Sequence, residues 1–327
     1  MVTLNKKIKF NKIAKKVIEL EIQALRKLKK YIDISFDQAV AAIVKCQSKI
    51  VLCGVGKSGL IASKISATFS SVGSPSFTIS ANDGSHGDLG SISKKDVLIL
   101  ISNSGNTQEL KNIIQYANRN KITLIGITAK KNSTLYCASD IKLAIPEVEE
   151  SGYGIVPTSS TTVQLCLGDA LAIASMQSKN FNKLDFKKFH PAGNLGSKLK
   201  TVEDLMLTKK KIPFIGENSN MKVALSSIIS KKLGLLVVKN KAGITTGIFT
   251  DGDMKRLVKK NKNFYDFKIN EIMNKNPISV EKNMLATKAL SFMSSKKITS
   301  LCVHESRNKK KTIGVLHIHN ILNASVK

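Results

Sequence analysis

Residues 102–107 of this chain read Ser-Asn-Ser-Gly-Asn-Thr, a run of small and polar residues that could bind an anion. Five consecutive apolar residues precede the run, and apolar residues at helical spacing follow it from Leu110 onward. Hydroxyl groups and the unpaired N–H groups at the start of a helix both donate hydrogen bonds to anions, and the helix dipole is positive there. The alternative is an ordinary helix N-cap with a turn glycine.

A second polar turn, residues 54–59, reads Gly-Val-Gly-Lys-Ser-Gly and presents Lys57 and Ser58 at a helix start. Its glycines are spaced as in a dinucleotide fingerprint, but the acidic residue expected about twenty positions later is absent. A P-loop would need a glycine where Val51 stands. We therefore reject both nucleotide signatures and interpret Lys57 as a charge for an anionic substrate; the alternative is a solvated surface lysine.

A third cluster consists of five consecutive hydroxyl residues, 158–162, directly after Pro157. Capping a helix needs one or two hydroxyls, so this number suggests a binding role for Thr158, Ser159 and Ser160. Three polar turns at one edge of a sheet, together with one lysine, suit a phosphate-bearing polyol.

Acid–base groups stand near these turns in the sequence. His86 lies in a glycine-rich loop, His190 precedes Pro191, and Glu109 and Glu150 flank polar segments. A lone histidine is often structural, and a first-turn glutamate is favoured by the helix dipole alone. No His or Cys spacing supports a metal site, so we expect none.

Strand and helix patterns alternate through the first half of the chain, which predicts an α/β fold with a parallel sheet covered on both faces. Ligands of such sheets bind at the carboxyl ends of the strands, where the polar turns fall. The expected strands are 50–53, 76–79, 97–101, 122–127 and 141–145, and the expected flanking helices include 5–31, 37–47 and 158–178.

The second half contains an internal repeat. Asp-Leu-Met at 204–206 recurs as Glu-Ile-Met at 271–273, and Gly-Ile-Phe at 247–249 recurs as Gly-Val-Leu at 314–316. Both recurrences are separated by 67 residues, which indicates a tandem pair of small α/β modules.

Composition excludes several classes of function. The net charge of +29 comes almost entirely from lysine spread along the 327 residues, and no recognition helix or stacking-aromatic motif appears, so we do not expect nucleic-acid binding. No apolar run is long enough to span a membrane, and the N-terminus lacks the apolar core of a signal peptide. Five cysteines without C-x-x-C spacing indicate reduced thiols and a cytoplasmic location.

Several motifs occur in an order that resembles one family. They are GKSG at 56–59, SHGDLG at 85–90, ISNSG at 101–105, PTSSTT at 157–162, GDALA at 168–172, HP at 190–191, GIFTDGD at 247–253 and GVLH at 314–317. Together they resemble the arabinose 5-phosphate isomerases, in which a sugar isomerase (SIS) domain precedes two CBS modules. The resemblance implies an N-terminal helix at 1–35, an SIS domain at 36–182, a linker carrying His190 at 183–203, and CBS modules at 204–266 and 267–327.

The resemblance also implies an activity: interconversion of D-arabinose 5-phosphate and D-ribulose 5-phosphate for synthesis of the lipopolysaccharide sugar Kdo. It places the phosphate on Ser102, Ser104 and Thr107, with Ser58 and His86 also lining the site. It implies a homotetramer in which His190 reaches a neighbour's site. The catalytic set that it implies is Lys57, Glu109, Glu150 and His190.

Aldose–ketose exchange through an enediol needs a base, a group that stabilises the enediolate oxygen, and a ring-opening acid–base group. We favour Glu150 over Glu109 as the base and His190 for ring opening. No cofactor is required.

Two departures from the family leave alternatives open. The segment 151–153 differs from the usual family sequence and is one residue shorter, so another sugar phosphate is an alternative substrate, and a sensor without turnover is a second alternative. Thr250 and Asp253 keep a nucleotide-binding pattern of CBS modules, whereas His317 and Asn320 depart from it. A nucleotide there and a purely structural dimerisation role are both open.

Overall fold

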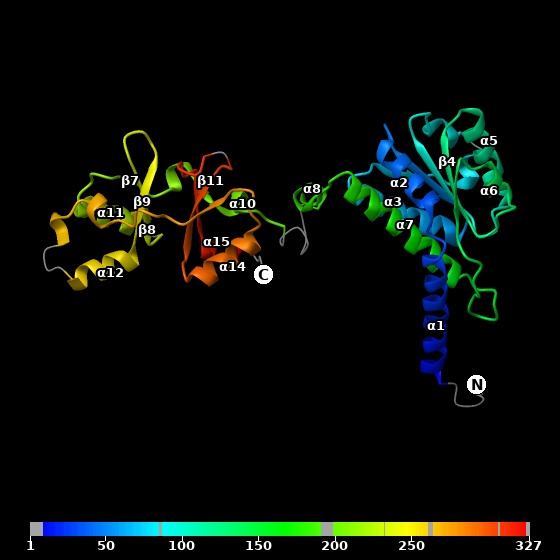
Figure 1. Ribbon diagram of the computed structural model, residues 1–327, viewed down its shortest axis with the longest axis horizontal. Coiled ribbons are helices and arrows are strands. Elements are labelled where there is room, and N and C mark those ends of the chain that lie inside the picture. Colours follow the sequence, from blue (N-terminus) through cyan, green and yellow to red (C-terminus); the bar gives the residue numbers. More distant parts are fainter. Residues whose placement is uncertain are drawn as a thin grey trace. The chain divides into compact units, whose positions relative to one another are not determined.

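The computed structural model describes residues 9–84, 87–190, 199–231, 233–260, 264–306 and 308–324. The chain forms two compact units, Met1–Phe186 and Lys187–Lys327, which Figure 1 shows in blue to green and in green to red. None of the helices in the described part of the chain is both long and apolar enough to cross a membrane.

The first unit is built on a five-stranded, all-parallel sheet in the order β2-β1-β3-β4-β5, which confirms the predicted fold. Its strands are β1 (Ile50–Gly54), β2 (Ser76–Thr78), β3 (Val97–Ile101), β4 (Thr123–Thr128) and β5 (Ile141–Ala144). The central strand β3 is buried along its whole length, as its uninterrupted apolar sequence predicts.

Helices cover both faces of this sheet (Figure 1). The helical segments are α1 (Phe10–Lys29), α2 (Ile34–Lys45), α3 (Lys57–Ser71), α4 (Ala81–Gly84), η1 (Asp88–Ser91), η2 (Gln108–Leu110), α5 (Lys111–Arg119), α6 (Thr134–Ala138), α7 (Ser159–Ser178) and α8 (Lys183–Phe189). Successive side chains of β3 point to opposite faces: Ile99 packs with α1, α2, α3 and α7, whereas Leu98 packs with α4, α5 and α6.

Two predicted helix boundaries are wrong. The helix expected at 37–47 is α2, which spans Ile34–Lys45 and begins after Asp33 as its N-cap. The helix expected to begin beside the turn at 102–107 begins only at Lys111, after the short 3₁₀ segment η2. Glu109 therefore lies in a 3₁₀ turn and not in the first turn of an α-helix.

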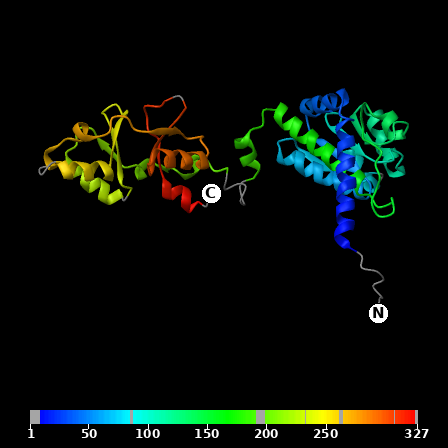
Figure 2. The same ribbon diagram turned by 60° about the horizontal axis from the view of Figure 1, so that its bottom comes forward.

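Helix α1 is only partly covered. Ala24 and Leu28 in its second half are buried in the core, whereas Phe10 and Ile13 near its start are 69% and 54% exposed. Figures 1 and 2 both show the first half of this helix extending beyond the sheet.

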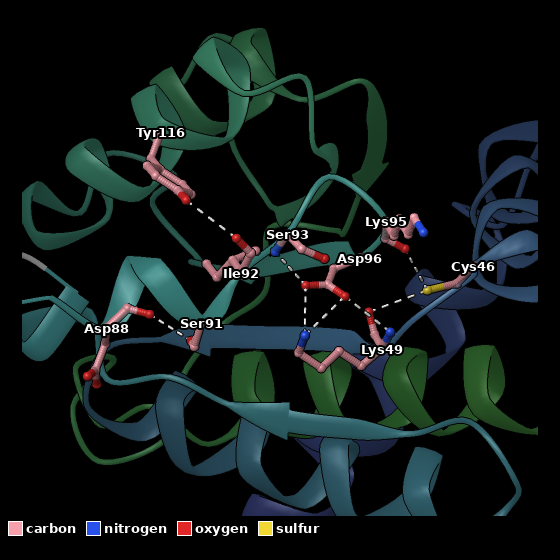
Figure 3. A network of polar contacts seen from close by, with 9 residues as sticks. All are labelled: Cys46, Lys49, Asp88, Ser91, Ile92, Ser93, Lys95, Asp96 and Tyr116. Atoms are coloured by element: carbon pink, nitrogen blue, oxygen red, sulfur yellow. Dashed lines mark hydrogen bonds and ion pairs between the residues drawn. The ribbon is translucent and has the colours of Figure 1, made fainter.

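Asp96 joins β1 and β3 at the amino-terminal edge of the sheet (Figure 3). Its carboxylate is 2% exposed and accepts hydrogen bonds from the Ser93 amide (2.6 Å) and the Lys49 amide (3.2 Å). The Lys49 ammonium also lies 3.1 Å from it. Burial alone would raise the pKa of Asp96, but these hydrogen bonds outweigh it and hold that pKa below its ordinary value.

The second unit contains a three-stranded sheet, β7-β8-β9, and a four-stranded sheet, β10-β11-β12-β6. Its strands are β6 (Leu207–Thr208), β7 (Phe214–Gly216), β8 (Leu235–Lys239), β9 (Thr245–Thr250), β10 (Ser279–Glu281), β11 (Ser300–His304) and β12 (Gly314–His317). Its helical segments are α10 (Val202–Leu205), η3 (Lys209–Lys211), α11 (Met221–Lys231), α12 (Asp251–Lys260), η4 (Phe264–Asp266), α13 (Ile269–Ile272), α14 (Ala286–Lys296) and α15 (Ile318–Asn323).

The two repeats exchange their first segments. Val202 of α10 packs in the core of the second module, and β6 pairs with β12. Conversely, Ile269 of α13 packs in the core of the first module. The Met206 side chain lies where a Cβ on Gly314 would stand, and the Met273 side chain occupies the matching place beside Gly247. The repeated Met and Gly residues thus contact each other across the pair of modules.

Candidate active site

The polar turns that follow β1 and β3 lie at the point where the order of the strands in the sheet reverses. Strands β1 and β3 are neighbours, and Gly54 at the end of β1 is in register with Ile101 at the end of β3. The helices that follow these strands, α3 and α5, pack on opposite faces of the sheet. The two loops therefore diverge, and a crevice at such a switch point is the usual ligand site of an open parallel sheet.

The turn at 102–107 is organised by its own hydroxyls. Ser102 Oγ lies 2.7 Å from Thr107 Oγ1 and accepts a hydrogen bond from the Gly105 amide at 3.0 Å. Ser104 Oγ accepts from the Asn106 amide at 3.3 Å. None of these hydroxyls caps η2 or α5, so the ordinary N-cap interpretation does not hold.

Neighbouring segments hold this turn rigidly. Gly105 has a positive φ of 67°, and its carbonyl accepts from the Leu135 amide at 3.0 Å. A Cβ at Gly105 would lie 2.0 Å from Ser133 Oγ, so only glycine fits. The Asn106 side chain accepts from the Thr134 amide at 2.9 Å. Asn106 thus ties the turn to α6.

The turn also presents backbone N–H donors toward the edge of the sheet. Within the described residues, the amides of Ser104 and Thr107 make no hydrogen bond. Ser104 is exposed and Thr107 is half-buried, so both can reach a ligand. Two free N–H groups and three hydroxyls in a rigid turn form a cup for an oxyanion.

Lys57 and Ser58 begin α3 on the other side of the crevice. Gly56 precedes them with a φ of 58°, which turns the chain from strand to helix. Lys57 is exposed, whereas Ser58 Oγ donates to Gln164 Oε1 on α7 at 3.0 Å. Gln164 is fully buried, and its Nε2 has no partner among the described residues. Sequence reasoning missed Gln164 because it lies 106 residues from Ser58 in an ordinary helical pattern.

Glu150 is fixed at the start of α7. Its Oε2 accepts from the Thr158 amide at 2.8 Å and from the Ser160 amide at 3.3 Å. Oε1 has no partner among the described residues. The carboxylate is therefore oriented by one oxygen, and the other remains available.

The contacts of the hydroxyl residues 158–160 are mostly with the protein's own backbone and side chains. Thr158 Oγ1 accepts from the Ser151 amide at 3.1 Å, next to Glu150. Ser159 and Ser160 are buried, and Ser159 Oγ has no partner in the described part of the chain. The predicted binding role of these three residues remains a prediction.

Comparison with known proteins identifies the family. A model of the SIS domain matches residues 43–174, and a model of the CBS domain matches residues 202–260 and 269–327. Arabinose 5-phosphate isomerase KdsD of Yersinia pestis is 39% identical over 98% of this chain and 97% of that protein. The Salmonella typhi protein of the same name is 38% identical over 97% of this chain and 96% of its own length.

This chain belongs to the arabinose 5-phosphate isomerase family.

A solved structure, Escherichia coli CFT073 c3406 in complex with arabinose 5-phosphate, shares 36% identity with this family member and a TM-score of 0.55. It covers 57% of this chain and is itself covered completely. A Listeria monocytogenes structure described as a putative sugar-phosphate isomerase shares 30% identity with a TM-score of 0.56, again over 57% of this chain. The resemblance to a family of sugar-phosphate isomerases is thus confirmed.

The remaining predicted site residues of this isomerase-family chain lie in different places. Glu109 is exposed in η2, two residues after Thr107. His190 follows α8 and belongs to the second unit. His86 lies outside the described residues. Among the described residues, no group of three or more His, Cys, Asp or Glu side chains could hold a metal ion.

An open cavity of about 300 Å³ adjoins the β1–α3 turn. Its polar walls include Gly56 and Ser63 on one side and Ser80 and Asn82, after β2, on the other. Space for a small ligand therefore exists beside Gly56, at the carboxyl edge of the sheet, between the segments that follow β1 and β2.

Proposed function

We propose that this chain interconverts D-arabinose 5-phosphate and D-ribulose 5-phosphate. The observation that carries the proposal is the hydroxyl turn at 102–107, whose Ser104 and Thr107 amides have no partner among the described residues. It follows β3 at the strand end that lies beside the end of β1, where α3 begins with Lys57. A phosphate dianion on Ser102, Ser104 and Thr107 would satisfy those donors. The names of the full-length relatives support the choice of substrate.

In this proposal Glu150 moves the proton between C1 and C2 of the open-chain sugar. Its Oε2 is anchored by the amides of Thr158 and Ser160 at the start of α7, and its Oε1 has no partner among the described residues. This arrangement suits a group that must remove and return one proton in a fixed position. Glu109, exposed beside the phosphate turn, is the alternative base. Lys57 stabilises the negative charge that develops on the enediolate oxygen.

The chemistry requires only proton transfer, so we propose that neither a redox cofactor nor a metal takes part. We further propose a role in supplying D-arabinose 5-phosphate for Kdo and lipopolysaccharide synthesis, supported by the shared name of the relatives.

The decisive experiment follows isomerisation by NMR in D₂O with chelator-treated protein. Arabinose 5-phosphate should yield ribulose 5-phosphate that carries solvent deuterium at the exchanged carbon. Glu150→Gln should lower kcat by about 10³-fold, the middle of the range for a positioned base, and Glu109→Gln by much less. Reversed effects would make Glu109 the base.

Parallel reactions with ribose 5-phosphate and glucose 6-phosphate test the substrate. If deuterium enters only ribose 5-phosphate or only glucose 6-phosphate, the substrate is another sugar phosphate, which the unusual segment 151–153 allows. Binding of arabinose 5-phosphate with no exchange would indicate a sensor and overturn the proposal.

We also propose a homotetramer in which His190 opens the sugar ring in a neighbouring subunit's site. His190→Ala and Glu150→Gln chains, each inactive, can be mixed, unfolded and refolded together. If the site is shared, hybrid tetramers regain part of the activity, because some sites contain both intact residues. If His190 acts within its own chain, only the residual activities of the two variants remain.

A further inference from the structure

Gln164 of α7 is a fully buried amide that contacts the first turn of α3. The residue is 0% exposed, and its Oε1 accepts a hydrogen bond from Ser58 Oγ at 3.0 Å. Its Nε2 is also buried and has no hydrogen-bond partner among the described residues. The contact with Ser58 thus joins two helices at the carboxyl edge of the sheet, where the polar turns lie.

Stability alone does not favour an amide at this position. A buried N–H group without an acceptor is costly, and methionine offers a side chain of similar length without that group. Residues that break a rule of folding in this way are expected at functional sites. The contact with Ser58 is then the reason for an amide here.

This contact fixes the direction of the Ser58 hydroxyl proton. An amide oxygen only accepts hydrogen bonds, and a serine hydroxyl has one proton and two lone pairs. Because Ser58 donates its proton to Gln164, its oxygen can only accept from a ligand. Ser58 is half-buried, so a ligand in the crevice can reach that oxygen.

An acceptor distinguishes the two ends of a sugar phosphate. A phosphate monoester has lost both protons above its second pKa of about 6, so it has nothing to donate to Ser58. A sugar hydroxyl does donate. The Ser104 and Thr107 amides in the turn at 102–107 are donors and suit the phosphate. The two turns therefore complement opposite ends of one ligand.

Close backbone contacts hold Ser58 and Gln164 in place. A Cβ at Gly54 would lie 2.8 Å from the Ser58 carbonyl carbon. A Cβ at Gly168, one turn after Gln164, would lie 2.2 Å from the Ile65 side chain of α3. A larger residue at either glycine would displace α3, so both glycines keep Gln164 within hydrogen-bond reach of Ser58.

We propose that Gln164 is a positioning residue, which holds the Ser58 hydroxyl as an acceptor for one hydroxyl group of the sugar. It acts through Ser58 and does not touch the ligand. The proposal rests on the proposed function for the class of ligand, a sugar phosphate, and adds how its polyol end is recognised.

Calorimetric titration of the full chain with D-arabinitol 5-phosphate tests this. The alditol has hydroxyl groups and a phosphate but no carbonyl group, so it binds without being isomerised. Gln164→Met should weaken its binding about tenfold, the effect of losing one hydrogen bond. Methyl phosphate, which has no hydroxyl to donate, should bind wild type and variant with affinities equal within about twofold.

Turnover should show the same division. The Gln164→Met variant should raise KM for arabinose 5-phosphate about tenfold and leave kcat within about threefold, because the lost contact is made equally in the ground state and the transition state.

A double-mutant cycle separates positioning from a merely structural role. Ser58→Ala removes the acceptor and should weaken binding of the alditol by about the same factor of ten. Adding Gln164→Met to Ser58→Ala should then change the affinity by less than about twofold, because the amide has no hydroxyl left to position. Losses that multiply in the double variant would overturn the proposal.

Ser175→Ala is the matched control. Ser175 is equally buried on α7, and its hydroxyl also has no partner among the described residues, but it lies about three turns beyond Gln164. This variant should bind the alditol as wild type does. If neither Gln164→Met nor Gln164→Leu unfolds cooperatively in urea, Gln164 is a structural residue and the proposal is overturned.

Two further results would overturn it: unchanged binding of the alditol in Gln164→Met, and equal weakening of alditol and methyl phosphate binding. A wild-type chain that binds the alditol but does not isomerise arabinose 5-phosphate would overturn the proposed function alone. A wild-type chain that isomerises the sugar, with a Gln164→Met variant that binds the alditol normally, would overturn the role of Gln164 alone.

Discussion

The amino-terminal and carboxyl-terminal ends of strands β1 and β3 differ in whether their polar groups have hydrogen-bond partners. At the amino-terminal end, Asp96 is buried and hydrogen-bonded to Ser93 and Lys49 (Figure 3). At the carboxyl-terminal end, in the turn that begins one residue beyond Ile101, the Ser104 and Thr107 amides have no hydrogen-bond partner in the part of the chain that the structure describes. The same two strands thus carry a satisfied polar network at one end and an open one at the other.

Because of this difference, one end of the strands contributes to the stability of the fold and the other remains available for a ligand. A buried carboxylate with all its partners in place stabilises the fold, because removing it leaves the Lys49 and Ser93 donors without an acceptor. Unpaired donors contribute nothing to folding and remain available for a ligand. We therefore expect substitutions at the two ends to have separable effects on the free energy of unfolding and on catalysis.

The largest expected effect is that of Asp96→Ala. Removing the buried carboxylate leaves the Ser93 and Lys49 amides without an acceptor, and this should lower the free energy of unfolding by about 3 kcal/mol, measured by urea denaturation. Asp88→Ala, an exposed acidic residue drawn in the same view, is the control and should change it by less than about 0.5 kcal/mol. Equal effects of both would mean that the Asp96 network contributes no special stability.

Lys57→Met should have the next largest effect and act on catalysis alone. Loss of a charge that stabilises the enediolate should reduce kcat/KM by about 100-fold, or about 2.7 kcal/mol. The unfolding midpoint should stay unchanged, because Lys57 is exposed. Lys64→Met, farther along α3 and paired with Asp169, is the matched control. A loss of stability without loss of activity in Lys57→Met would contradict the separation of the two ends.

Gly105→Ala should lower the stability of the fold and also weaken binding of the sugar phosphate. The variant tests whether the turn at 102–107 must be rigid to bind its ligand. The positive φ and the close Ser133 side chain predict a loss of about 2 kcal/mol in stability. Displaced donors should also raise KM for the sugar phosphate more than they lower kcat. Gly154→Ala, at another positive φ but with open space around it, should leave KM unchanged.

The smallest expected effect is a pH dependence at Asp96. Its folded-state pKa is lowered, so it contributes stability above the unfolded value of about 3.9, and this contribution is lost as the pH falls through the folded value. The stability gap between wild type and Asp96→Asn should therefore shrink as the pH falls from neutral through about 3.9 and below. A constant or growing gap would contradict the lowered pKa.

Local sequence patterns predicted the elements of the first unit well. Apolar runs of strand length and polar turns are local signals, and all five predicted strands are present with boundaries shifted by one residue or so. The start of α5 was misplaced because Leu110, in a 3₁₀ turn, continues the helical spacing of apolar residues without belonging to the helix.

Contacts between distant segments could not be predicted in this way. The hydrogen bond between Ser58 and Gln164 depends on how α7 packs beside α3. That packing requires Gly168, where a Cβ would lie 2.2 Å from the Ile65 side chain. Nothing in the sequence around Ser58 or Gln164 indicates that the two residues are partners.

The sequence by itself determined the alternation of strands and helices, the polar turns, and the 67-residue repeat, because each depends on residues close together in the chain. Only the tertiary structure decided the strand order, which sets Gly54 beside Ile101 and so brings two turns to one crevice. It alone decided the exchange of Met206 and Met273 between modules, and the cavity of about 620 Å³ that residues of both modules line. These features depend on the burial of apolar faces between segments far apart in the chain, which local periodicity does not record.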